Sequence, residues 1–327
     1  MEASRSFFSK LLKLNSIQGN NYFPSNSKIW YLDCSGVQIP TSAVSQGIPN
    51  SDLHIYIIAQ NTPQSRHLAS AQICGYNDQY MRPSFGRILF NLAKVGQQQS
   101  HEQFQSDLET TIHEILHILG FNGFQMQFWI NPKTGQYYGK SGVNQIIKVV
   151  TFRGLPTKIV QTKNIVLTAR KYFDCPVMEG MQLENQGEDG SLGSHWEQLL
   201  VQNEIMISSR VNSGTQLSIF TVALLRDTGY YTEVDENMSQ KLYWGRGKGC
   251  SFVIDGCYSK QKSFSEFPKQ KGIQCSFEND GYGEPSATPY TDRCQIKIDA
   301  LLLQALMELK QFKIVKEDVI FFNALQI

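Results

Sequence analysis

The chain has 327 residues, enough for roughly two domains of about 150 residues each. Its formal net charge is +1 and its pI is near 7.6, so no charge excess directs it toward nucleic acid or an acidic membrane surface. Hydrophobic residues make up 41% of the chain, which suffices for a buried core. No apolar run reaches the roughly 20 residues that a membrane-spanning helix needs.

The first half of the chain predicts little regular structure before a pair of strands. Residues 1–28 mix Ser, Asn and Lys without an apolar period, which predicts a poorly ordered start, interpreted as a truncated pro-region. They contain no apolar core of the length that a secretory signal needs. Asp52–Gln60 predicts a buried strand, Arg87–Asn91 a second short strand after a turn at 82–86, and the Gln-rich stretch 96–105 a polar loop.

A helix is predicted from residue 106 to residue 120. Ser106 and Glu109 have the spacing of a capping box, which typically opens a helix. An apolar stripe follows at helical spacing, and Gly120 is well placed to end the helix at its C′ position. The stripe consists of Leu108, Ile112, Ile115 and Leu119.

This predicted helix carries the sequence His113-Glu114-x-x-His117. On a helix the two imidazoles lie one turn apart on the same face, where they can share one metal ion. Neutral imidazoles suit Zn²⁺, and Glu114 can take a proton from a water that the metal activates. The alternative interpretation is a chance match on an amphipathic helix, because the pattern specifies only three residues.

A catalytic zinc site needs a third protein ligand. In the compact form of this motif the third histidine follows the helix at a position that Gly123 occupies here, and glycine has no side chain to bind metal. The remaining histidines are therefore the candidates, and His195 is the best of them on spacing. It follows a Gly-rich segment and begins a second predicted helix, which a capping box at Ser194–Glu197 opens toward residue 203. The other candidates are His54, His67 and His101.

Further elements are predicted downstream. Ile146–Phe152 predicts a strand, and Val166–Phe173 and Gln216–Asp227 predict helices. Residues 241–293 are rich in Gly, Lys and Cys, and 298–310 and 319–322 predict a helix and a strand. Seven cysteines, none in a Cys-x-x-Cys pair, favour disulfides in an exported protein. Free buried thiols in a cytosolic protein are the alternative.

Four separate stretches carry specific motifs, namely His113-Glu114-x-x-His117-x-x-Gly120-Phe121, Cys175-Pro176-x-x-Glu179-Gly180-x-x-Leu183-Glu184-x-Gln186-Gly187, Gly193-Ser194-His195-Trp196-Glu197 and Asn203-Glu204-x-Met206. Together they resemble the leishmanolysin family, the protozoan surface metalloproteases of the metzincin clan, and the resemblance covers about residues 50–260. The family resemblance implies that a long insertion separates the helix from the third zinc ligand, which is His195. It also implies that Met206 forms the Met-turn, an apolar floor beneath the histidines; from the residues alone, Met206 is an ordinary core side chain.

The resemblance further implies two disulfides, Cys34–Cys74 and Cys175–Cys250, with Cys257 pairing further into the C-terminal region. The fold class expected is α+β: a metzincin-like catalytic domain with a twisted sheet and the active-site helix, a more helical central subdomain and a Cys-rich C-terminal region. The expected boundaries are 1–28, 29–121, 122–240 and 241–327, with both ends of the chain incomplete. A bound peptide is expected along an edge strand near Arg87–Asn91.

The implied function is a zinc-dependent metalloendopeptidase with one Zn²⁺ per chain, acting on protein or peptide substrates. The resemblance implies an extracellular or cell-surface location, although no signal peptide is visible and no residues support membrane attachment. The alternative is a catalytically inactive surface or adhesion protein that keeps the protease fold; retention of Glu114 and all three histidines favours the enzyme. A purely structural zinc site fits poorly, because such sites usually close with four Cys or His ligands.

Overall fold

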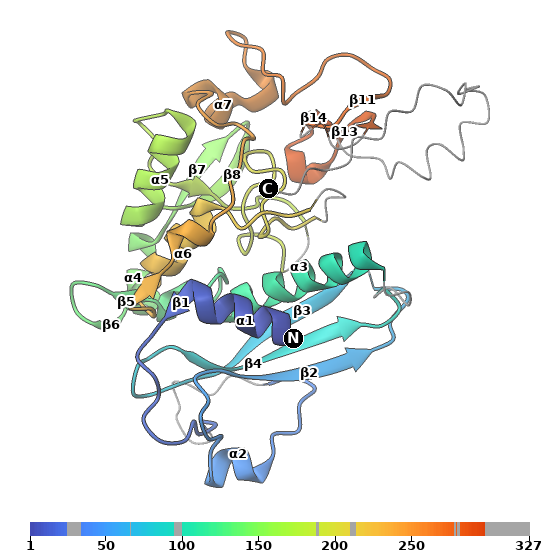
Figure 1. The fold of residues 1–327 in the computed structure, drawn as a ribbon. Helices are drawn as coiled ribbons and strands as arrows, with labels where there is room; N and C mark the ends of the chain where they lie inside the picture. The colour runs from blue at the N-terminus through green and yellow to red at the C-terminus, as the bar shows by residue number, and fades with distance from the viewer. Residues whose placement is uncertain are drawn as a thin grey trace.

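The fold is mixed α/β. Its N-terminal part contains a three-stranded sheet, and the longest helix of the described residues packs on this sheet. The computed structural model describes residues 1–24, 34–65, 67–94, 100–187, 190–209, 214–277, 279 and 282–297. Strands β2 (His54–Gln60), β3 (Ala69–Tyr76) and β4 (Pro83–Asn91) pair in the order β2-β4-β3. β2 runs parallel to β4 and β3 antiparallel to it. Helix α3 (His101–Ile118) packs on this sheet, most extensively against β3 (Figure 1).

The centre of the sheet, β4, differs from the expectation. The strand begins at Pro83, so the turn predicted at 82–86 is mostly strand, and a third strand, β3, was not predicted. Because β4 pairs on both sides, Arg87–Asn91 cannot accept a peptide strand, and the edge-strand prediction there is wrong; β2 and β3 are the edges. Gly86 lets α3 approach closely, since a Cβ there would lie 2.8 Å from the side chain of Ile118.

The N-terminus also differs from the expectation of a poorly ordered start. Residues Glu2–Leu11 form helix α1, which contacts α3, and β1 (Leu12–Lys13) pairs with β10 (Glu233–Val234). Ser4 and Leu11 are buried, and Phe7 packs against the core. The i, i+3, i+7 spacing of these three residues is a short helical stripe that the polar composition hides. Figure 1 shows α1 and α3 side by side.

The central region combines a second sheet with two packed helices. Strands β7 (Ile147–Phe152), β8 (Leu155–Val160) and β9 (Met181–Gln182) form an antiparallel sheet in sequence order. Helices α5 (Lys163–Phe173) and α6 (Ile219–Asp227) pack together, and the Asp227 carboxylate accepts hydrogen bonds from Thr162 Oγ1 at 2.6 Å and Ile165 N at 3.1 Å. The predictions of a strand at 146–152 and of these two helices are confirmed within three residues.

The smaller elements of the described residues connect these units. They are the short helices α2 (Thr41–Ser45), α4 (Gly139–Gly142) and α7 (Cys250–Asp255), and the short strands β5 (Ile130–Asn131), β6 (Gln136–Tyr137), β11 (Gln274–Cys275), β12 (Tyr282–Gly283), β13 (Pro285–Ala287) and β14 (Gln295–Lys297). The helix and the strand predicted at 298–310 and 319–322 lie outside the described residues.

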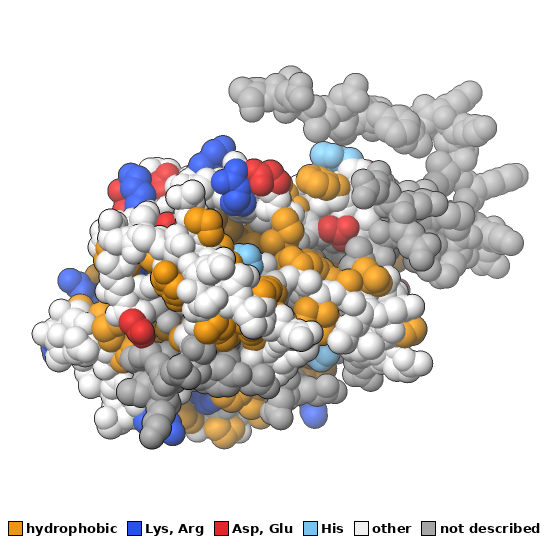
Figure 2. Space-filling model, turned by 90° about the horizontal axis from the view of Figure 1, so that it is seen from below, with side chains coloured by type: hydrophobic (Ala, Val, Ile, Leu, Met, Phe, Trp, Pro, Cys, Tyr) orange, Lys and Arg blue, Asp and Glu red, His pale blue; other side chains and the backbone are white. Residues whose placement is uncertain are grey.

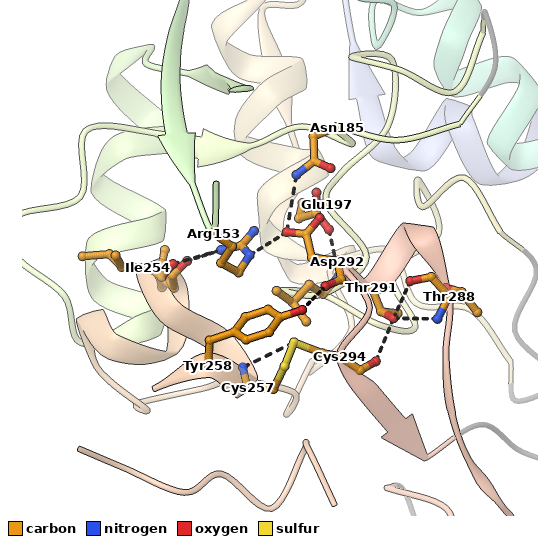
Figure 3. Close-up of a disulfide and its surroundings, with 12 residues drawn as sticks. Arg153, Asn185, Glu197, Ile254, Cys257, Tyr258, Thr288, Thr291, Asp292 and Cys294 are labelled. Atoms are coloured by element: carbon orange, nitrogen blue, oxygen red, sulfur yellow. Dashed lines mark hydrogen bonds and ion pairs between the residues drawn. A yellow bond between two sulfur atoms is a disulfide. The ribbon is translucent and has the colours of Figure 1, made fainter. Parts of the chain in front are cut away.

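Three disulfides and one buried ion pair cross-link the chain. The predicted pairs Cys34–Cys74 and Cys175–Cys250 are present, and Cys257 pairs with Cys294. Next to this last disulfide, Arg153 in the β7–β8 turn donates from Nε to Asp292 Oδ2 at 2.5 Å, with both side chains 1% exposed (Figure 3). Of the three cysteines in the Cys-rich segment 241–293, Cys250 and Cys257 form disulfides and Cys275 is free and exposed.

One face of the molecule carries little concentrated charge. On the face shown in Figure 2, Lys and Arg side chains are scattered among uncharged and hydrophobic ones, without a continuous basic patch among the described residues. Within the described part of the chain, every helix is too short or too polar to cross a membrane.

Candidate metal centre

Helix α3 presents the first two histidines. It begins earlier than predicted, at His101, with Ser100 as the N-cap whose side chain accepts from Gln103 N at 3.1 Å. The stretch from residue 101 to 105 is therefore helix, and the predictions of a loop there and of a cap at Ser106 are wrong. The spacing Ser-x-x-Gln at 100–103 is itself a capping pattern. His113 and His117 lie one turn apart near the C-terminal end of this helix, with their rings in contact.

The end of α3 shapes the site. Gly120 has φ +133° and follows the C-cap Leu119, as predicted. Phe121 N donates to Leu116 O at 3.0 Å, which folds the chain back over the last helical turn in the manner of a Schellman motif. This turn brings the Phe121 carbonyl within 2.6 Å of His117 Nδ1. The turn that ends α3 therefore also orients the His117 ring.

A close backbone contact brings the third histidine, His195, to the C-terminal end of α3. Gly123 and Gly193 approach so tightly that a Cβ at position 123 would lie 2.3 Å from Gly193 O. Gly123 N also donates to Ser194 Oγ at 3.3 Å. The Ser194 side chain thus bonds to the loop after α3, and the helix predicted to begin there is not formed: residues 194–203 are turns and an isolated bridge at Trp196.

The three histidines converge through their Nε2 atoms. The Nε2···Nε2 distances are 3.1 Å between His113 and His117, 3.2 Å between His117 and His195, and 3.2 Å between His113 and His195. Each ring turns its other nitrogen, Nδ1, to a backbone carbonyl: Ile205 O at 2.6 Å, Phe121 O at 2.6 Å and Ser191 O at 3.2 Å, respectively. Carbonyl oxygens only accept, so each Nδ1 carries the hydrogen and each Nε2 presents a lone pair.

These residues fit a zinc ion. Three lone pairs that face one another at 3.1–3.2 Å repel unless a cation lies between them. A tetrahedral site with zinc–nitrogen bonds of about 2.0–2.1 Å has ligand–ligand edges of about 3.3 Å, close to the spacing here. Hydrogen bonds from the non-ligating nitrogen to carbonyls are typical of metal-binding histidines. Of the residues that the structure describes, this is the one group of three or more His, Cys, Asp or Glu side chains able to hold a metal ion.

Burial tunes the ionisable groups of the site. Desolvation lowers the pKa of His113, lowers that of His117 to about 3, and places the pKa of His195 well below its ordinary value. The rings are therefore neutral at physiological pH, as metal ligation requires. Desolvation also raises the pKa of Glu114 to about 8, and a cation at the histidines would lower it again.

Met206 lies fully buried in the chain segment that supports the histidines. Its carbonyl accepts from Trp196 N at 2.9 Å, next to His195, and the preceding carbonyl, that of Ile205, holds His113. The turn at Met206 therefore contacts the His113 ring through the Ile205 carbonyl and lies next to His195 through the backbone of Trp196.

Some parts of the site carry no signal in the sequence. The orienting groups at 121, 191 and 205 are backbone carbonyls, which any residue supplies. His54, His67 and His101 lie outside the cluster: His54 packs against Tyr56 and Phe85. Glu204 belongs to a motif quoted above, but the sequence analysis predicted no role for it.

A helix that carries His-Glu-x-x-His, joined by a third histidine, is the arrangement typical of metallopeptidases. Comparison with known proteins agrees: the model of the leishmanolysin family matches residues 9–297, and the chain belongs to this family. It is 31% identical over 239 residues to a leishmanolysin-like peptidase of Drosophila pseudoobscura pseudoobscura, covering 64% of this chain and 34% of the relative.

Two more distant relatives show the same pattern of coverage. Leishmanolysin of Leishmania tropica is 24% identical over 265 residues, which is 81% of this chain and 36% of the relative. The ciliated left-right organizer metallopeptidase of Danio rerio is 27% identical over 266 residues, 76% of this chain and 40% of the relative. The matched region therefore spans well under half the length of each of these relatives.

Proposed function

We propose that this chain is a zinc-dependent metalloendopeptidase of the metzincin type. The observation that carries the proposal is the convergence of three imidazole Nε2 atoms at 3.1–3.2 Å, each ring held by a carbonyl at its Nδ1. His113, His117 and His195 would hold one Zn²⁺ per chain, and Met206 would form the floor beneath them. Family membership supports the proposal, because two of the relatives named above are a peptidase and a metallopeptidase by name.

The histidines and Glu114 have different proposed roles in the reaction. A zinc ion held in this way supplies Lewis-acid chemistry, acidifying water and polarising a carbonyl. Glu114, next to His113 and only 6% exposed, accepts a proton from the attacking water and delivers it to the leaving amine. Its buried position keeps bulk water from competing for that proton. The neutral, Nδ1-protonated histidines cannot act as this base, because their free lone pairs face one another.

The substrate is proposed to bind along β3. β3 is an edge strand, and it is the strand that packs most extensively against α3, so its free edge lies beside the helix that carries Glu114. A peptide can add to such an edge through main-chain hydrogen bonds. We propose that residues 29–121 and 122–240 act as two subdomains that supply Glu114 and His195 respectively, with 241–327 packed beside them.

The three disulfides support an extracellular or cell-surface location, because disulfides persist in oxidising compartments. The rival function is an inactive adhesion protein with the protease fold. Zinc analysis together with casein hydrolysis, with and without a chelator, separates the two. We expect one zinc per chain and hydrolysis that the chelator abolishes and added zinc restores. Zinc binding without hydrolysis would favour the adhesion protein, and absence of zinc from the folded protein would overturn the proposal.

A further inference from the structure

Glu204 is a completely buried carboxylate that the proposed mechanism does not use. It lies in the turn that precedes Met206, and its two oxygens accept four hydrogen bonds. Oε2 accepts from Met206 N, and Oε1 accepts from Ser218 N at 3.2 Å, Ser218 Oγ at 2.8 Å and Thr221 Oγ1 at 2.5 Å. One side chain therefore ties the Met206 turn to the first turn of α6, of which Ser218 is the N-cap.

This tie reaches His113 through one residue. Ile205 lies between Glu204 and Met206, and its carbonyl is the group 2.6 Å from His113 Nδ1. The peptide groups on both sides of Ile205 are held: Ile205 N donates to Gln216 O at 2.9 Å, and Met206 N donates to the Glu204 carboxylate. The direction of the Ile205 carbonyl follows from these two bonds, and it sets the tilt of the His113 ring.

A second branch reaches the neighbour of His195. Thr221, which donates to Glu204, accepts from Trp196 Nε1 at 3.0 Å. Trp196 follows His195 directly, and its backbone N donates to Met206 O at 2.9 Å. The indole and the backbone of this tryptophan are thus both fixed to groups that Glu204 holds.

We propose that Glu204 is a positioning residue of the metal centre, whose carboxylate sets the orientation of His113 through the Ile205 carbonyl and of His195 through Thr221 and Trp196. The inference deepens the proposed function and rests on it, since it presumes that these histidines bind zinc. Two of the three ligands, 82 residues apart in the chain, are thereby linked to one buried group.

Only a carboxylate satisfies this arrangement. Both oxygens accept, and two of the four donors are backbone N–H groups, Met206 N and Ser218 N, which cannot reverse their role. A glutamine would turn its NH₂ toward one of them and leave two donors facing each other. Burial raises the pKa of Glu204 to about 7, and the four donors oppose this rise.

The test compares zinc affinity, by competition with a chromophoric chelator, and the visible spectrum of the Co²⁺-loaded protein. Glu204→Gln is expected to weaken zinc binding about 10–100-fold, the usual effect of removing a group that orients a ligand, and to shift the Co²⁺ bands. The matched control is Glu266→Gln. Glu266 is equally buried, but its carboxylate accepts from Gly245 N and Ser265 Oγ and pairs with Lys248 Nζ at 3.3 Å, all in the C-terminal region. This control should lower the melting temperature without changing zinc affinity or the spectrum.

Each outcome decides the inference. If Glu204→Gln lowers only the melting temperature of the zinc-free protein, with affinity and spectrum unchanged, Glu204 is merely structural and the inference is overturned. Should that variant fail to fold, Thr221→Val carries the test, because it removes the bridge to Trp196 at nearly constant volume; an unchanged affinity and spectrum there overturn the inference equally. A wild-type protein that binds neither metal overturns the proposed function itself.

Discussion

The contact between Gly123 and Gly193 offers a sharp test of how the third ligand is brought to the site. In Gly123→Ala the new Cβ would lie 2.3 Å from Gly193 O, whereas real contacts of this kind essentially never fall below 3.0 Å. The two segments must therefore separate by at least 0.7 Å, the difference between these distances. His195 lies two residues from Gly193, and metal ligands tolerate errors of only about 0.2 Å.

We expect Gly123→Ala to weaken zinc binding about 10–100-fold and to lower the free energy of unfolding by about 1–3 kcal/mol, the usual cost of overpacking. Chelator competition measures the first quantity and urea unfolding of the zinc-free protein the second. Gly214→Ala is the control, because a Cβ there meets only Glu109 Oε1 at an ordinary 3.5 Å. If Gly123→Ala kept a zinc affinity within about twofold of wild type, the reasoning would be refuted, since the position of His195 would then not depend on the absence of a side chain at residue 123.

Two further predictions follow from burial, and a third follows from the linkage between zinc binding and folding. Burial lowers the pKa values of the three histidines, so few protons should compete with zinc for them near neutral pH. Zinc affinity, measured in Glu114→Gln, should therefore change by less than about fivefold between pH 7.5 and 6.0. A fall in affinity of about 50-fold, expected for three histidines with a pKa of about 6.5, would contradict this. Arg153→Leu should cost about 3–5 kcal/mol in urea unfolding by leaving Asp292 buried and unpaired, whereas Lys148→Ala, at an exposed pair, should cost about 1 kcal/mol or less; equal costs would contradict the assignment. Zinc at 100 times its dissociation constant should stabilise the protein by about 2.7 kcal/mol, and an unchanged melting temperature would show that zinc does not favour the folded state.

The predictions that held depend on neighbours in the sequence. The end of α3 at Gly120, the strand at 146–152 and the helices α5 and α6 follow from local periodicity and capping. The disulfide pairs and the family were predicted from the resemblance, because spacing alone does not determine which cysteines meet. Periodicity predicted the elements, whereas motifs predicted which of them come together.

The errors arose where a distant partner decides the structure. Ser194 has the sequence of a helix cap, yet its hydroxyl accepts from Gly123 N, 71 residues away. A peptide was expected to bind along an edge strand near Arg87–Asn91, but β3, which was not predicted, pairs along one side of this strand. α1 was missed because its polar composition conceals the short stripe of Ser4, Phe7 and Leu11, which is buried against the core. Local patterns cannot report such partners, since the contacts exist only in the folded chain.

The central claim is that His113, His117 and His195 form one zinc centre at which Glu114 moves the proton. The most direct test is Glu114→Gln, which keeps the size of the side chain and all three histidines. The account predicts that this variant retains one zinc per chain while peptide hydrolysis falls by about 10²–10⁴-fold, the usual contribution of a general base. Hydrolysis near the wild-type rate with zinc bound would contradict the role of Glu114.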